Sequence, residues 1–205
     1  MSLNAKSMSA LLGCALCLLS GCVNLGAGTT QRTRLFVLSP LNTAETTATQ
    51  RTDGDFSLGV GPLTLPAYLD RPQVVTRIAD NEISIAAFAN WAEPLDRNFQ
   101  RTLAENLALL LGTQGVYPHP WRSALRPTHR LLLEVIRFDA NPAGDAVLSV
   151  RWEVLDDRGE PMIPKRKGVF RQAVTQEDVA GVVAAMSSVL ADFSREAAAA
   201  IASQP

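Results

Sequence analysis

The chain has 205 residues, of which 47% are hydrophobic and 19% are charged. This balance fits one globular domain, or two small ones, and argues against a disordered chain. The formal net charge of −1 excludes the strongly basic surface of a nucleic-acid binder. No apolar run reaches the roughly 18 residues of a membrane-spanning helix, and the two histidines do not favour a histidine-rich metal site.

The start of the chain has the pattern of an export signal. A single positive side chain, Lys6, precedes an apolar stretch over residues 10–19, and small residues follow up to Gly21. A charged start, a short apolar run and small residues before a cleavage point are typical of a secretory signal peptide. We therefore expect residues 1–21 to be a lipoprotein signal peptide, removed by cleavage between Gly21 and Cys22.

All three cysteines lie in this region. The quartet Leu19-Ser20-Gly21-Cys22 resembles the bacterial lipobox, in which a peptidase cuts before the cysteine and diacylglycerol is attached to its sulfur. The alternatives are an ordinary signal peptide with a chance cysteine and an intracellular CxxC pair at Cys14 and Cys17. The pair lies inside the apolar run, whereas redox and zinc motifs need polar, electropositive or turn surroundings. The pattern therefore favours a lipoprotein.

Cleavage leaves Cys22 as the one cysteine of the mature chain, so a disulfide cannot form. We expect no cofactor beyond the covalent diacylglycerol and N-acyl lipid (palmitate) on Cys22, and two or more acyl chains give stable anchoring. Val23 follows, where an aspartate retains enteric lipoproteins in the inner membrane, so we expect the periplasmic face of the outer membrane. Residues 22–33 are read as a lipidated tether, and residues 34–205 as a single domain.

The predicted elements before the first helix are two strands, a polar loop, a proline-fixed turn and a hairpin. Gly59 and Gly61, inside the second strand, indicate a bulge or a close backbone approach. In chain order these elements are a strand over 34–38, a threonine-rich loop over 41–54, a strand over 56–65, the turn over 65–72 and the hairpin over 73–87.

Two amphipathic helices flank a strand meander in the second half. Apolar residues such as Phe99 recur at helical spacing after Pro94, which suits a first helical position, and Gly112 is a C-cap candidate. Thr175 and Asp178 form a capping-box-like start of the last helix. The expected spans are a helix over 94–111, a connection over 113–128, strands over 129–139, 146–155 and 168–174, and a helix over 175–202. The predicted fold is α+β: a mostly antiparallel sheet with two main helices on one face, an α/β sandwich.

The sequence carries no motif of a known catalytic class, because GxSxG, Walker and HExxH patterns are all absent. His119 and His129 have no cysteine or paired acid at ligand spacing and are read as surface or strand-end residues. Asp70 and Glu93 would have to lie close together in a hydrolase; an ion pair between Arg71 and an acid is the simpler account. The basic run over 165–167 is read as a solvated turn, or as a contact for anionic head groups or a partner.

Five stretches carry a resemblance to a known family: Gly59-Val60-Gly61-Pro62, the segment 65–77, Trp91-Ala92-Glu93-Pro94-Leu95, Leu103-Ala104-Glu105-Asn106-Leu107, and Pro120-Trp121. Together with the lipobox and the early strand, they resemble the PqiC family over essentially the whole mature chain. These are the auxiliary lipoproteins of ABC-type transport systems that use MCE (mammalian cell entry) proteins.

The resemblance implies a non-enzymatic role and an α/β sandwich fold. Such lipoproteins lie at the outer membrane and help an MCE protein move phospholipid or other hydrophobic cargo across the periplasm, which maintains membrane integrity. An inner-membrane permease and, in many systems, an ATPase complete the apparatus. The resemblance also implies assembly into homo-oligomeric rings that dock an MCE tube. The alternatives are a stand-alone periplasmic lipoprotein that binds lipid or cell-wall material directly, and a periplasmic hydrolase.

The proline-fixed turn is the candidate partner-contact segment, because it carries tyrosine, leucine and arginine, which are residue types found at protein interfaces. A purely structural turn that orders two strands is the alternative. Trp91 either stacks on a ligand or partner or packs as an apolar anchor beneath a helix N-terminus. The candidate contact residues are Leu65, Pro66, Tyr68, Leu69, Asp70, Arg71, Pro72 and Trp91.

Overall fold

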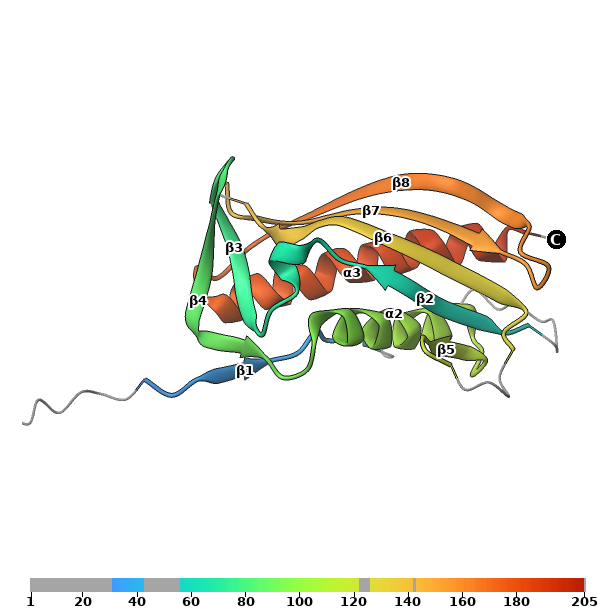
Figure 1. Ribbon diagram of the computed structural model, residues 1–205, viewed down its shortest axis with the longest axis horizontal. Coiled ribbons are helices and arrows are strands. Elements are labelled where there is room, and N and C mark those ends of the chain that lie inside the picture. Colours follow the sequence, from blue (N-terminus) through green and yellow to red (C-terminus); the bar gives the residue numbers. More distant parts are fainter. Residues whose placement is uncertain (1–30, 43–55, 122–125, 142, 205) are drawn as a thin grey trace, which may run out of the picture. The chain divides into compact units, whose positions relative to one another are not determined.

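Within the residues that it describes (31–42, 56–121, 126–141 and 143–204), the computed structural model has two helices on one face of an eight-stranded mixed sheet (Figure 1). This arrangement, which belongs to the unit Arg32–Pro205, confirms the predicted α+β class. The elements are β1 (Arg34–Phe36), β2 (Leu58–Thr64), the 3-10 helix η2 (Ala67–Leu69), β3 (Gln73–Ala79), β4 (Glu82–Trp91), α2 (Leu95–Leu111), β5 (Val116–Pro118), β6 (His129–Ala140), β7 (Asp145–Leu155), β8 (Pro161–Ala173) and α3 (Val179–Ala202).

Strand β6 is the junction of the sheet. One of its edges pairs with β7, which pairs in turn with β8, and both of these long ladders are antiparallel. The other edge pairs in parallel with β2 along its first half and with β3 at Ala140. Strand β2 leads on to β5, and β3 leads on to β4 and β1. The long ladders are therefore antiparallel, as predicted, and the short pairings of β1, β2 and β5 are parallel.

The first predicted helix is confirmed with almost the expected bounds. Helix α2 begins after Pro94, whose carbonyl accepts the N–H groups of Arg97 and Asn98. It ends at Gly112, which has a left-handed φ of 64° and whose N–H bonds the carbonyl of Leu109. The predicted apolar stripe is buried at every position: Leu95, Phe99, Leu103, Leu107, Leu110 and Leu111.

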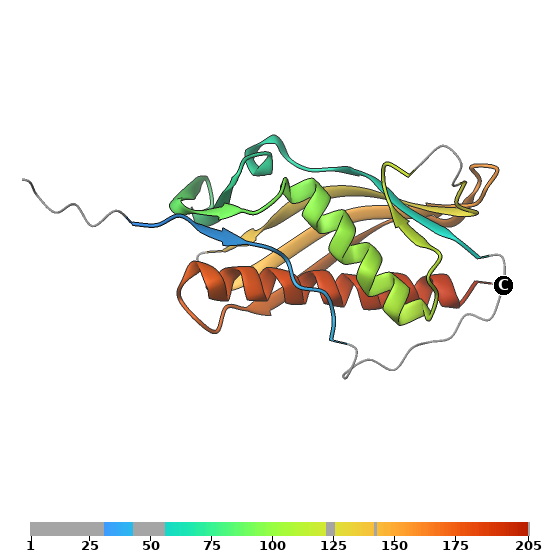
Figure 2. The same cartoon turned by 90° about the horizontal axis from the view of Figure 1, so that it is seen from below.

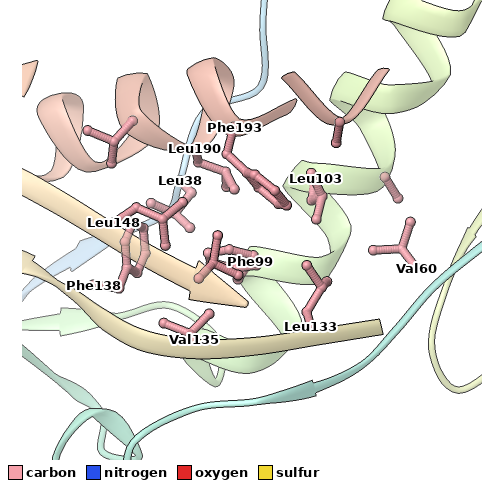
Figure 3. Packing of buried hydrophobic residues seen from close by; sticks show 14 of the residues in the cluster. Leu38, Val60, Phe99, Leu103, Leu133, Val135, Phe138, Leu148, Leu190 and Phe193 are labelled. Carbon is pink, nitrogen blue, oxygen red and sulfur yellow. The ribbon is translucent and has the colours of Figure 1, made fainter. Parts of the chain in front are cut away.

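The second helix begins slightly later than the capping-box pattern predicted. Asp178 is itself the N-cap, and its carboxylate accepts the N–H of Gly181 at 2.9 Å. Side chains of α3 and α2 meet the inner face of the sheet in one core (Figure 3), where Phe99 lies edge-on to Phe138 with 5.3 Å between ring centroids. Burial of this continuous apolar core stabilises the fold.

A segment after β1, residues 37–42, crosses the helix layer (Figure 2); we call it the N-terminal strap. Its backbone N–H groups donate to three side chains of the helices: Leu38 to Asn98 Oδ1 at 3.0 Å, Ser39 to Ser187 Oγ at 3.1 Å, and Leu41 to Asn106 Oδ1 at 2.7 Å. The end of this segment, residues 41–42, belongs to the threonine-rich loop predicted over 41–54. Most of that predicted loop, 43–55, lies outside the described residues.

The basic run over 165–167 was wrongly predicted as a turn, because it lies inside β8. The Arg166 guanidinium carbon lies 4.9 Å from the ring centroid of Trp152 on β7, and Lys165 pairs with Glu153 at 3.5 Å. Cross-strand partners on β7 therefore accommodate these two charges in an extended strand. Neither β5 nor η2 was predicted.

Candidate partner-contact surface

The proline-fixed turn is closed by its own hydrogen bonds. The N–H groups of Leu69 and Asp70 donate to the carbonyls of Pro66 and Ala67, forming η2. Arg71 completes the turn because its Nε donates to the carbonyl of Tyr68 at 2.9 Å. The segment is therefore a rigid protrusion between β2 and β3.

Two of the candidate contact residues belong to the core. Leu69 is 2% exposed and Trp91 is 5% exposed, so neither offers its side chain to a partner. Trp91 instead ties strands together, since its N–H donates to the carbonyl of Pro72 at 2.7 Å. This position favours the anchor role for Trp91 at the start of α2, and it leaves six candidates with accessible surface: Leu65, Pro66, Tyr68, Asp70, Arg71 and Pro72.

The end of the turn and the entry to α2 enclose a surface pocket of about 340 Å³. One wall is the segment 70–72, and the other is the segment 91–95, which carries the Trp-Ala-Glu-Pro motif. The backbone bond from Trp91 to Pro72 holds the two walls together. Two motifs that are separate in the sequence therefore form a single surface feature.

The charges of this pocket are arranged differently from the prediction. Among the described residues, Arg71 forms no ion pair, and its one side-chain hydrogen bond is the bond from Nε to the Tyr68 carbonyl. Glu93 is instead held by Arg101, whose Nη2 lies 2.8 Å from Glu93 Oε1. The hydrogen bond to Glu93 also raises the pKa of Arg101. The Nη groups of Arg71 can consequently bind an incoming carboxylate or carbonyl oxygen.

Tyr68 links the turn to the centre of the sheet. Its hydroxyl donates to Asp139 Oδ2 on β6 at 2.9 Å, and Asp139 is fully buried. Arg137 Nε donates to Asp139 Oδ1 at 2.7 Å, and Arg77 Nη2 lies 3.6 Å from Oδ2. Burial and, second, the negative charge of Asp139 raise the pKa of Tyr68 to about 12.

Sequence reasoning missed Asp139 and its arginines, although a signal was present. Asp139 lies next to the end of the strand HRLLLEVIRFDA, beside apolar residues, with an arginine two residues before it on the same face. A buried carboxylate needs hydrogen-bonding partners, so this pair could have been recognised as a polar contact. The nature of that contact, a tyrosine 71 positions away, depends on the tertiary fold.

The glycines of the Gly-Val-Gly-Pro stretch have a packing role. A β-carbon on Gly59 would lie 2.8 Å from side-chain atoms of Trp121 and Pro127. Gly61 has a φ of 116°, and a β-carbon there would collide with Gln100 Oε1 and lie 2.7 Å from His119 Cβ. Gly59 therefore allows Trp121 of the Pro120-Trp121 pair to pack closely against β2, and Gly61 allows the close approach of His119 and Gln100.

Other predicted features fall outside this surface. Gly21 and Cys22 lie outside the described residues, so the cleavage and lipidation sites stay predictions. Within residues 31–42, 56–121, 126–141 and 143–204, no helix is long and apolar enough to cross a membrane. The same residues contain no group of three or more His, Cys, Asp or Glu side chains that could hold a metal ion.

Comparison with known proteins identifies the family. A family model described as the ABC-type transport auxiliary lipoprotein component matches residues 36–198. The chain is 30% identical over 154 residues to the Intermembrane transport lipoprotein PqiC of Escherichia coli (strain K12), covering 75% of this chain and 76% of that protein. The protein of the same name from Shigella flexneri gives the same values.

Two solved structures share the fold. A crystal structure of an uncharacterized protein matches with a TM-score of 0.68 and 23% identity, over 83% of this chain and 99% of that chain. A crystal structure of a protein from Xanthomonas campestris matches with a TM-score of 0.66 and 17% identity, over 83% and 96% of the two chains.

The family match covers most of the domain, and it confirms the resemblance noted in the sequence. The related proteins are named as transport lipoproteins, which is a non-enzymatic role. The chain therefore belongs to the PqiC family of ABC-type transport auxiliary lipoproteins.

Proposed function

We propose that this lipoprotein is anchored to the periplasmic face of the outer membrane through Cys22, where it holds an MCE protein that carries phospholipid or other hydrophobic cargo. The observation that supports the proposal most is the family match over residues 36–198. The name of the Escherichia coli relative, an intermembrane transport lipoprotein, agrees with it. An inner-membrane permease and ATPase, and assembly of this chain into a ring, are parts of the same proposal.

Physical chemistry gives such an auxiliary protein a clear task. Lipid tails are costly to expose to the aqueous periplasm, so cargo needs a continuous shielded path. A domain tied to the outer membrane by acyl chains can keep the far end of that path in place. Such a role requires a stable binding site for a partner and no catalytic site.

The pocket between residues 70–72 and 91–95 is the proposed binding site for the partner. Its walls combine apolar surface from Pro72 and Pro94 with the Arg71 guanidinium, whose Nη groups have no bond to a described residue. An apolar side chain of the partner would fill the pocket, and a neighbouring carboxylate or carbonyl oxygen would bind Arg71. Arginine at the edge of a rigid apolar pocket is a frequent feature of strong protein contacts.

Co-purification tests the partner and the pocket together. The full-length lipoprotein, extracted with mild detergent from its own organism, should retain an MCE protein. Arg71→Glu should strongly reduce the amount retained, because it places a like charge against the partner's oxygen atoms. Arg158→Glu is the matched control, because Arg158 is exposed in the turn between β7 and β8. Equal retention by both variants would exclude the pocket, and no retention by the unmodified chain would contradict the adaptor role.

Cys22→Ser tests the anchor. The variant cannot form the thioether, so it should lose the diacylglycerol mass and leave the outer-membrane fraction. If the variant still fractionates with the outer membrane, the proposed anchoring is wrong. A chain that is correctly anchored but binds lipid or cell-wall fragments in the absence of an MCE protein would support the stand-alone alternative.

A further inference from the structure

Exposed apolar side chains are concentrated at one end of the described domain. Among the described residues, six large apolar side chains are more than 40% exposed, and five of them lie on β1, the strap or the β3–β4 hairpin. The sixth, Val169, lies on β8. The five are Leu35 (67%), Val37 (47%), Ile78 (51%), Ile85 (44%) and Phe88 (47%). Such clustering on a folded domain indicates a surface that meets an apolar environment.

Strand register places three of these side chains together. Phe36 pairs with Trp91 across the parallel β1–β4 ladder, and both belong to the core side of the sheet. Leu35 pairs with Asn90, so it lies on the opposite face, and Phe88 is the diagonal neighbour of Leu35 on that face. Val37, two residues after Leu35, extends the same side of the chain. We call Leu35, Val37 and Phe88 the apolar end patch.

The patch lies next to the anchor in the sequence. Arg34, the first residue of β1, lies twelve positions after Cys22, and a fully extended chain of that length reaches about 40 Å. If Cys22 is acylated, which is part of the proposed function, the start of β1 stays within that distance of the membrane. Arg32 is exposed just before the patch, and an arginine there can reach lipid phosphates while apolar side chains enter the membrane interface. Arg34 lies on the opposite face of β1, where it pairs with Asp178 at 3.4 Å.

We propose that the apolar end patch rests on the lipid surface to which Cys22 is anchored. Leu35, Val37 and Phe88 enter the interfacial region, and Arg32 stays at head-group level. Acyl chains alone would hold the domain near the membrane but leave its orientation free. A second contact on the same strand fixes which end of the domain faces the lipid, so that β1 and the β3–β4 hairpin lie toward the membrane.

Spin labelling of the complete lipoprotein tests this contact. No cysteine follows Cys22 in the sequence, and acylation consumes that thiol, so Phe88→Cys introduces the one free thiol of the mature chain. The labelled protein is reconstituted into vesicles of phosphatidylethanolamine and phosphatidylglycerol. Collisions of the nitroxide with oxygen, which enters lipid, are then compared with collisions with a water-soluble nickel chelate. Val169→Cys is the matched control, since Val169 is 43% exposed against 47% for Phe88.

The label at position 88 should collide several-fold more with oxygen than with the nickel chelate, and the label at position 169 should show the reverse. Leu35→Cys should repeat the result for position 88 if the Phe88 variant folds poorly. Vesicle flotation and the acyl mass check the anchor independently. A chain that floats but exposes position 88 to nickel overturns the membrane contact alone, and a chain that does not float overturns the anchor and the contact together. Shielding of position 88 from both reagents would identify a second copy of the chain as its cover and would also overturn the proposal.

Discussion

At the scale of single residues, glycine 61 shows how a short motif is used for packing. Its φ of 116° lies in the region that side chains with a β-carbon disfavour, and Gln100 and His119 occupy the space a side chain would need. Gly144 offers a contrast: its φ is 86°, but no described residue other than its chain neighbours lies within 4 Å of the position a β-carbon would take. Comparing substitutions at the two glycines therefore distinguishes the effect of backbone strain from the effect of steric conflict.

Gly61→Ala should lower the free energy of unfolding by about 2–5 kcal/mol, because strain and overpacking add. Gly144→Ala should lower it by about 1–2 kcal/mol, since strain acts alone. Urea denaturation of both variants measures the difference. Equal losses of unfolding free energy in the two variants would mean that Gln100 and His119 move aside freely. Packing would then not explain the presence of glycine at position 61.

Tyr68 provides a second test at this scale. Tyr68→Phe removes the hydroxyl that donates to the buried Asp139, so the free energy of unfolding should fall by about 1–3 kcal/mol. The folded protein holds the pKa of Tyr68 at about 12, above the ordinary value of 10.0, so it favours the protonated phenol. The stabilisation of the fold by the protonated Tyr68 phenol is therefore complete below pH 10 and is lost as the pH rises from 10 toward 12. The stability gap between wild type and Tyr68→Phe, measured by urea denaturation at pH 8, 10 and 11, should shrink only in the alkaline range; a gap that widens there would contradict the network.

At the scale of elements, the strap is held by a polar row on α2. Asn98, Thr102 and Asn106 recur every four residues, and all three are fully buried. Asn98 and Asn106 accept strap N–H groups, and the Thr102 hydroxyl lies 3.4 Å from the carbonyl of Leu38. Asn106 Nδ2 also donates to Ser194 Oγ on α3 at 3.0 Å. A row of polar side chains therefore binds an irregular segment where an apolar stripe could not satisfy its backbone.

Asn106→Leu should destabilise the protein by about 2–4 kcal/mol, because the Leu41 N–H loses its acceptor and Ser194 Oγ loses the donor Asn106 Nδ2, keeping its own bond to the Leu190 carbonyl. Glu105→Gln is the control one residue away; it weakens only an exposed ion pair with Arg101 and should change stability by less than about 1 kcal/mol. The melting temperatures of both variants, measured by thermal unfolding, test this prediction. Similar melting temperatures for the two would show that the strap contributes little to the fold.

The elements that could be predicted from the sequence are those whose pattern is local. Leucine periodicity and Gly112 located α2, and alternation located β7, because each depends only on neighbouring residues. The three-residue strand β5 and the first half of β8 were missed, since their extended conformation depends on pairing with β2 and β7. The same reason applies to the site: the turn and the Trp91 motif were recognised separately, but their joint pocket and the Tyr68–Asp139 bond are long-range contacts.

At the scale of the whole molecule, β1, which follows the proposed membrane anchor, is hydrogen-bonded to the proposed partner-binding pocket. Strand β1, which follows the predicted tether, bonds to the pocket wall because the carbonyl of Phe36 accepts the N–H of Ala92 at 2.9 Å. The strap then fastens the same stretch of chain to α2 and α3. A pull between membrane and partner would thus pass through paired backbone and buried side chains, as a tethering lipoprotein requires.

Photo-crosslinking in living cells tests the central claim most directly. Benzoylphenylalanine placed at Asp70, an exposed residue in the pocket wall, should give an ultraviolet-dependent adduct with the MCE protein. The same group placed at Arg158 should give no adduct. Arg158 is exposed in the turn between β7 and β8, which is remote from the pocket in the sequence and in the sheet order. An adduct from position 158 but not from position 70, or no adduct with an MCE protein from either position, would contradict the account.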